Sequence, residues 1–174
     1  MGLPDDPARP VILWFRQDLR LADHPALQAA LATGRALVPV YVLDDEDAGR
    51  WAAGGAGRWW LHHSLASLAA SLGRCGAPLV LRRGRAAAIL PALMAETGAV
   101  ELHAGRMHEP WARAVERQLA DSLGDALHLH RTATLFDLET IRTKTGGVYG
   151  VYTPFARTLR SRGDPAPPMD APGH

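Results

Sequence analysis

The sequence has very little cysteine, lysine and asparagine. Cys75 is the single cysteine among 174 residues, which excludes an internal disulfide and fits a reducing compartment. Lys144 is the single lysine and asparagine is absent, so arginine supplies nearly all of the positive charge. The formal net charge of +1 gives no general indication of nucleic-acid binding, which usually comes with a strongly basic face.

Long apolar runs are also missing. No stretch approaches the roughly 20 residues that a membrane-spanning helix needs. The first ten residues, MGLPDDPARP, are acidic and contain proline, unlike a signal peptide. We therefore expect a cytoplasmic protein without membrane contact. A chain of this length suits one domain, which buries about 70% of the surface that the unfolded chain exposes.

A buried strand followed by an abrupt change of polarity stands near the start of the chain. Residues 11–15, VILWF, form a short apolar run that is typical of a strand covered on both faces. Four charged or polar side chains follow within five residues: Arg16, Gln17, Asp18 and Arg20. These residues follow the carboxyl end of the strand, and open α/β sheets bind ligands at the carboxyl ends of their strands. Asp23 and Pro25 then predict a helix start, with Asp23 as the N-cap.

The rest of the chain alternates between strand and helix patterns. Further strands are predicted over 37–43, 78–83, 99–104 and 127–131, and helices from about 58 to 73, over 86–96 and from 109 or 110 to 123. This alternation predicts an α/β fold, a Rossmann-like five-stranded parallel sheet with helices on both faces. We expect an N-terminal extension over 1–10, the α/β domain over 11–160 and a proline-rich linker over 161–174.

Two patterns do not amount to sites. The glycines of 54–57 lack the Lys-Ser/Thr pair of a phosphate-binding loop, so this segment is predicted as a flexible loop. His128 and His130 share a strand face, but no third ligand is evident beside them, so no metal site is predicted. The five tryptophans are expected to pack in the core and against loops.

Three segments resemble the DNA photolyase and cryptochrome family. Residues 14–23, WFRQDLRLAD, are similar to the family's opening motif, although His24 follows where the family has Asn. Residues 109–113, EPWAR, resemble Tyr-Glu-Pro-x-x-Arg, and residues 142–155 contain pieces similar to Thr-Lys-x-Gly and Val-Phe-Thr-Pro-Phe. These matches follow the family's order from residue 11 to about residue 159.

The resemblance implies an N-terminal α/β domain that holds a light-harvesting antenna chromophore of the deazaflavin, reduced folate or flavin type. In full-length photolyases a downstream helical domain binds FAD, and excited reduced FAD passes an electron to a pyrimidine dimer flipped out of DNA. That domain has no counterpart in this sequence, so the chain alone is not expected to be catalytic. It is expected to work with an FAD-binding helical domain, in cis or in trans, and to meet UV-damaged DNA only through it.

The candidate cofactor-binding residues are Arg16, Gln17, Asp44 and Glu109, which follow the first, second and fourth strands. Carboxylates there are suited to accept hydrogen bonds from pterin or deazaflavin ring nitrogens. Asp44 and Glu109 match antenna-contact positions of deazaflavin-type relatives. Folate-type relatives use polar residues after the Glu109 position, where this chain has Trp111 and Ala112.

Structural roles compete with each of these assignments. Asp44 is equally suited to capping the next turn, and Glu109 is favoured at a helix start by the helix dipole. Arg16 is equally suited to pairing with neighbouring acids. A cryptochrome-type photoreceptor domain shares the same architecture, and a stand-alone nucleotide-binding α/β module without photochemistry is a further alternative.

Overall fold

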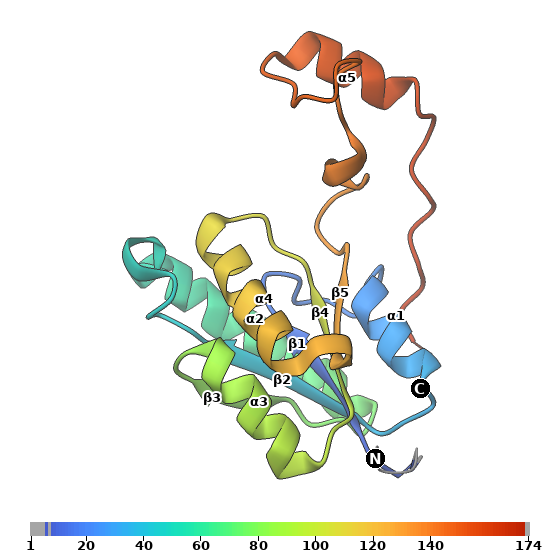
Figure 1. Cartoon of the computed structure of the whole chain (residues 1–174). Helices are drawn as coiled ribbons and strands as arrows, with labels where there is room; N and C mark the ends of the chain where they lie inside the picture. Colours follow the sequence, from blue (N-terminus) through green and yellow to red (C-terminus); the bar gives the residue numbers. More distant parts are fainter. Residues whose placement is uncertain (1–5, 7, 173–174) are drawn as a thin grey trace.

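The computed structural model describes residue 6 and residues 8–172, and its centre is a five-stranded parallel sheet (Figure 1). The strands are β1 (Val11–Phe15), β2 (Leu37–Leu43), β3 (Val80–Arg83), β4 (Glu101–Gly105) and β5 (Leu127–His130). Their order is β3-β2-β1-β4-β5. The first three strands are added toward one edge of the sheet, and β4 and β5 are added on the other side of β1. The predicted Rossmann-like α/β fold is confirmed. Most of the predicted extension over 1–10, and the last two residues of the predicted linker, lie outside the described residues.

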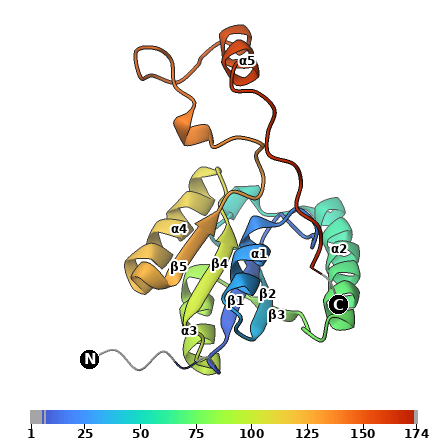
Figure 2. The same cartoon turned by 90° about the vertical axis from the view of Figure 1, so that its right-hand side faces the viewer.

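Helices cover both faces of the sheet (Figure 2). On one face, α1 (Pro25–Ala32) and α2 (Gly55–Arg74) pack against Leu13 and Phe15 of β1. On the other face, α3 (Ala86–Thr97) and α4 (Pro110–Leu123) pack against Ile12 and Trp14. Successive side chains of a strand point to opposite faces. The wholly apolar β1 therefore contributes to both cores, as the sequence predicted.

The start of α1 differs from the sequence prediction. His24, not Asp23, is the N-cap, and its Nδ1 accepts a hydrogen bond of 3.1 Å from the Leu27 amide. Asp23 instead has a φ of +50°, outside helical geometry. The prediction was wrong because imidazole is not among the common N-cap groups, although a neutral ring nitrogen can accept the same bond.

One helix extends beyond its predicted limits, and another was not predicted. The glycine run that was predicted as a loop forms the first turn of α2, with Gly54 as its N-cap. Arg58 stabilises this start by donating to the Ala53 carbonyl and by pairing with Asp45. A further helix, α5 (Tyr152–Arg160), was not predicted. Its sequence is strongly amphipathic, but nine residues are too few for the pattern to stand out.

Residues 135–163, which we call the arm, extend away from the sheet and carry α5 at their far end (Figures 1 and 2). Arg113 of α4 pairs with Glu139 at the base of the arm. The chain then returns without regular structure to α1, where the Met169 carbonyl accepts a hydrogen bond of 2.7 Å from the Asp23 amide. Among the helices that the structure describes, none is long and apolar enough to cross a membrane.

Candidate functional site

A cavity of about 190 Å³ opens at the carboxyl ends of β1 and β2, and we call it the edge cavity. Its principal lining side chains are Trp14, Arg16, Gln17, Tyr41, Asp44, Trp51, Met107 and Trp111. An open groove of about 790 Å³ shares Arg16, Gln17 and Tyr41 with it and continues along α2. This is the edge at which doubly wound α/β sheets bind ligands.

Arg16 lies on the floor of the edge cavity, but its charge is already compensated. Its Nη1 is 2.5 Å from the Glu116 carboxylate and donates to the Gly105 carbonyl at 3.1 Å. The guanidinium also lies 4.3 Å from the centre of the Trp14 ring. Burial lowers the pKa of Arg16 while Glu116 raises it, and an arginine stays charged under either influence. Arg16 thus shapes the cavity floor and ties β1 to α4.

Asp18 fixes the turn that follows β1. Its Oδ1 accepts a hydrogen bond of 3.0 Å from the Arg16 amide, and its Oδ2 lies 3.4 Å from Nε2 of the buried His24. Burial raises the pKa of the Asp18 carboxyl, but the adjacent His24 ring and the hydrogen bond from the Arg16 amide lower it and bring the pKa to about 2. A Cβ on Gly105 would overlap Asp18 and Thr132, so only glycine lets these elements approach.

Gln17 and Glu109 lie together, at the mouth of a neighbouring pocket of about 510 Å³. The Gln17 amide nitrogen is 3.5 Å from Glu109 Oε1, and Glu109 Oε2 accepts from the His108 amide at 3.1 Å. Glu109 is the N-cap residue of α4 but makes no capping bond with its side chain. Its carboxylate therefore keeps acceptor capacity for a ligand, since each oxygen has two lone pairs.

Asp44 makes the turn-capping contacts that its alternative interpretation expected. Its Oδ1 accepts hydrogen bonds from the amides of Glu46 and Asp47, at 3.1 and 2.9 Å. Its Oδ2 accepts from the amide of Ala86, at 2.9 Å, and so caps the first turn of α3. The structure thus brings Arg16, Gln17 and Asp44 to the edge cavity and leaves Glu109 beside it.

The tryptophans correct one sequence prediction. Trp14 is buried and Trp111 is half-buried, as expected of packing residues. Trp51, Trp59 and Trp60 are instead 69%, 63% and 70% exposed. Trp51 lines the edge cavity and Trp60 lines the adjoining groove. Residue composition alone gave no signal for this arrangement, because it depends on where α2 begins.

The fold is a doubly wound α/β domain, and the edge cavity opens at the edge of the sheet where such domains bind ligands. The family model described as DNA photolyase matches residues 11–173. The chain therefore belongs to the DNA photolyase and cryptochrome family, in which it corresponds to the N-terminal α/β domain.

Known relatives include both photolyases and cryptochromes. The deoxyribodipyrimidine photo-lyase of Agrobacterium fabrum is 43% identical over 166 residues, which cover 94% of this chain and 34% of the relative. Cryptochrome-1 of Arabidopsis thaliana is 30% identical over 166 residues, covering 92% of this chain and 24% of the relative. A crystal structure of a class III photolyase from Agrobacterium tumefaciens matches with a TM-score of 0.86 and 41% identity, over 95% of this chain and 34% of that one. The chain thus spans about a third or less of the length of these relatives.

Proposed function

We propose that this chain is the antenna-chromophore-binding domain of a deoxyribodipyrimidine photolyase, acting in light-dependent repair of DNA. The observation that carries the proposal is the edge cavity, which four aromatic side chains line at the carboxyl edge of the sheet. Binding sites for planar organic ligands are typically apolar and aromatic with a few fixed polar groups.

The chemistry of the edge cavity suits light harvesting better than catalysis. An antenna transfers energy, so its protein must hold a planar ring at a fixed distance and orientation and need not supply an acid or base. Arg16 is held by Glu116, and Asp44 is held by three backbone amides. Rigid groups of this kind orient a ligand well, because their own positions are already determined.

We assign the chromophore to the deazaflavin, reduced folate or flavin type, with its ring in the edge cavity and its remainder in the adjoining groove. Trp51 and Trp60 supply exposed aromatic faces for stacking. Glu109 and Gln17 supply polar groups at the rim. Trp111 stands where folate-type relatives have a polar residue, which favours a deazaflavin over a folate.

We further propose that the arm contacts an FAD-binding helical domain, supplied in cis or in trans, through which the protein meets UV-damaged DNA. The arm exposes a set of large apolar side chains: Leu135, Leu138, Val148, Val151 and Tyr152. Large apolar side chains that are exposed on one segment are typical of an interaction site. The greater length of the relatives is consistent with such a partner domain.

A cryptochrome-type photoreceptor domain is the second candidate. The similarity to Arabidopsis cryptochrome-1 favours it, but that relative is 30% identical, against 43% for the photolyase from Agrobacterium. The module without photochemistry has less support, because the glycine run that would have to cradle phosphates is part of α2.

The test is a near-ultraviolet and visible absorption spectrum of the purified chain, recorded before and after adding a deazaflavin, a reduced folate and FMN in turn. We expect one of them to bind in a one-to-one ratio with a red-shifted band. If none of the three binds, the antenna role is wrong.

A further inference from the structure

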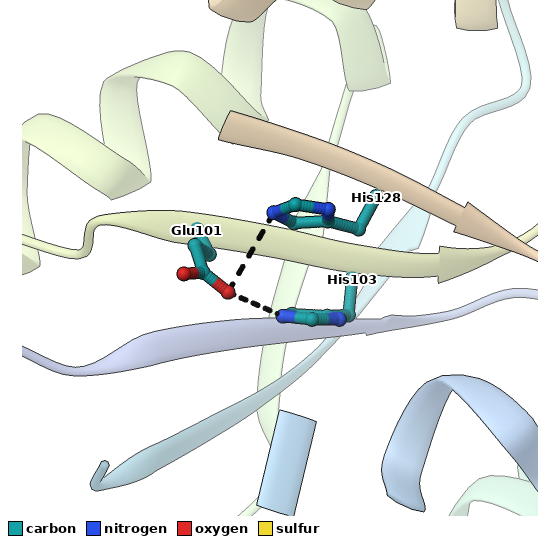
Figure 3. A group of neighbouring side chains, drawn as sticks. All are labelled: Glu101, His103 and His128. Carbon is teal, nitrogen blue, oxygen red and sulfur yellow. Dashed lines mark hydrogen bonds and ion pairs between the residues drawn. The ribbon is translucent and has the colours of Figure 1, made fainter. Parts of the chain in front are cut away.

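Three side chains with metal-binding atoms meet on β4 and β5, and none of them lines the edge cavity (Figure 3). Glu101 and His103 are two residues apart on β4, so they point to the same face of the sheet. His128 of β5 is the register partner of His103 and lies on that face too. Parallel pairing of β4 with β5, the next strand after α4, therefore assembles the cluster.

The distances within this cluster fit a single small cation. Glu101 Oε2 is 2.9 Å from His103 Nε2 and 3.6 Å from His128 Nε2, and the three ligand atoms all lie within 4.8 Å of one another. In a tetrahedral zinc site, bonds of about 2.0–2.1 Å place neighbouring ligand atoms about 3.3–3.4 Å apart. The rings of His103 and His128 are stacked, with centres 4.8 Å apart and planes 23° apart, so both rings have to turn toward each other for their nitrogens to reach one ion.

His130 lies behind His103 and contacts it through a ring nitrogen. Its Nε2 lies 3.1 Å from His103 Nδ1, the ring nitrogen that faces away from Glu101. Metal-binding histidines almost always hydrogen-bond through their second ring nitrogen, which fixes the tautomer and the ring orientation. The near-parallel rings of His103 and His130, 14° apart, are consistent with this fixed orientation.

The cluster is open to solvent on one side. The side chain of His103 is 5% exposed and forms the floor, whereas those of Glu101 and His128 are 31% and 41% exposed and form the entrance. An ion can therefore enter without any rearrangement of the backbone. β5 is the edge strand of the sheet, so an ion bound here would join it to β4.

We propose that Glu101, His103 and His128 bind one divalent transition-metal ion of the zinc class, with water as the fourth ligand. Two imidazole nitrogens and one carboxylate oxygen suit zinc and its neighbours, whereas magnesium and calcium prefer oxygen ligands alone. An ion on Nε2 of His103 requires the ring proton to be on Nδ1. The Nδ1–H group then donates a hydrogen bond to His130 Nε2. His130 then carries its own proton on Nδ1. This site is independent of the proposed antenna function.

The test is calorimetric titration of the metal-free chain, carrying no polyhistidine tag, with zinc chloride. We expect one ion to bind per chain and to raise the melting temperature. Glu101→Gln and His128→Gln should each weaken binding at least tenfold, and His130→Gln by about tenfold because it loses only the hydrogen bond to a ligand ring. Magnesium chloride should give no binding. Because Glu101 and His128 are partly exposed, both variants should fold, as their melting temperatures without metal will show.

The matched control removes two histidines elsewhere on the surface. His62 and His63 are exposed on α2, so the double variant His62→Gln with His63→Gln should bind zinc as the unaltered chain does. Long-range proton–nitrogen NMR spectra should show the ring protons of His103 and His130 changing nitrogen together when zinc is added. Absence of binding, unchanged binding in both Glu101→Gln and His128→Gln, or loss of binding in the control would overturn the proposal.

Discussion

At the scale of single residues, the turn after β1 depends on a carboxylate that is almost fully buried. Asp18 accepts a hydrogen bond from the Arg16 amide and lies beside His24. Its pKa is about 2 instead of the usual 3.8. A carboxyl whose pKa is lower in the folded state stabilises that state above its unfolded pKa. This stabilisation is lost as the pH falls through the folded pKa.

We therefore predict that Asp18→Asn lowers the free energy of unfolding by about 2 kcal/mol at neutral pH. The gap between variant and unaltered chain should narrow as the pH falls from about 4 toward 2, where Asp18 itself becomes protonated. Urea unfolding across this pH range measures both effects. A gap that stays constant with pH would show that the Asp18 charge contributes nothing.

Asp44 and Glu109 should separate stability from binding. Asp44→Ala removes three hydrogen bonds to backbone amides, so it should lower the free energy of unfolding by about 2 kcal/mol. Glu109→Ala removes only exposed contacts, with Gln17 and with the His108 amide, and should change stability by less than about 0.5 kcal/mol. Both variants should weaken chromophore binding by about 1–3 kcal/mol, the typical cost of an unpaired buried group.

Thermal unfolding and chromophore titration of the same two variants measure these effects. Unchanged chromophore retention in both would remove Asp44 and Glu109 from the site. A loss of binding confined to Asp44→Ala, in proportion to its loss of stability, would leave Asp44 with a structural role alone.

At the scale of elements, α1 depends on an unusual N-cap. The His24 side chain is fully buried, caps the Leu27 amide through Nδ1 and faces Asp18 through Nε2. His24→Ala should therefore lower the free energy of unfolding by about 3 kcal/mol, since it removes the cap, opens a cavity and leaves the buried Asp18 carboxylate without its partner.

His24→Asn is the matched control, because asparagine keeps the capping acceptor and is the residue that the family motif has at this position. It should cost clearly less than His24→Ala in urea unfolding at neutral pH. Equal losses in the two variants would show that the capping bond is unimportant and that only the volume of the ring matters.

The elements also show how far the sequence alone predicts this fold. β1, β2, α3 and α4 were predicted within one residue at each end, because apolar periodicity and proline or glycine mark their limits. The start of α2 was missed because a glycine run is not typical of a helix, and α5 was missed because nine residues repeat an apolar pattern over too few turns to stand out. Patterns that recur along the chain are visible in the sequence, whereas short or atypical ends depend on tertiary contacts.

The same distinction applies to the candidate sites. Strand ends predicted that Arg16, Gln17 and Asp44 gather at one edge, and they do line one cavity. The cluster of Glu101, His103 and His128 was missed, since it needs the register of β4 against β5. No periodicity within one strand specifies which residues of another strand lie opposite.

At the scale of the whole molecule, the chain combines a folded α/β body with an exposed apolar arm. The proposed antenna site lies at the carboxyl edge of the sheet, and the cluster on β4 and β5 is formed by other residues. Because separate residues form the two sites, changes that block the edge cavity should leave zinc binding intact. The central claim, that the edge cavity holds the chromophore, can therefore be tested by itself.

The most direct measurement is chromophore titration of two tryptophan variants beside the unaltered chain. Ala53 lines both the edge cavity and its groove, whereas Ala70 is exposed on α2 and lines neither. We predict that Ala53→Trp weakens binding of the chromophore about tenfold or more, because a large side chain overfills the site. Ala70→Trp should bind as the unaltered chain does. Full binding by Ala53→Trp would contradict the account, because the chromophore would then lie elsewhere.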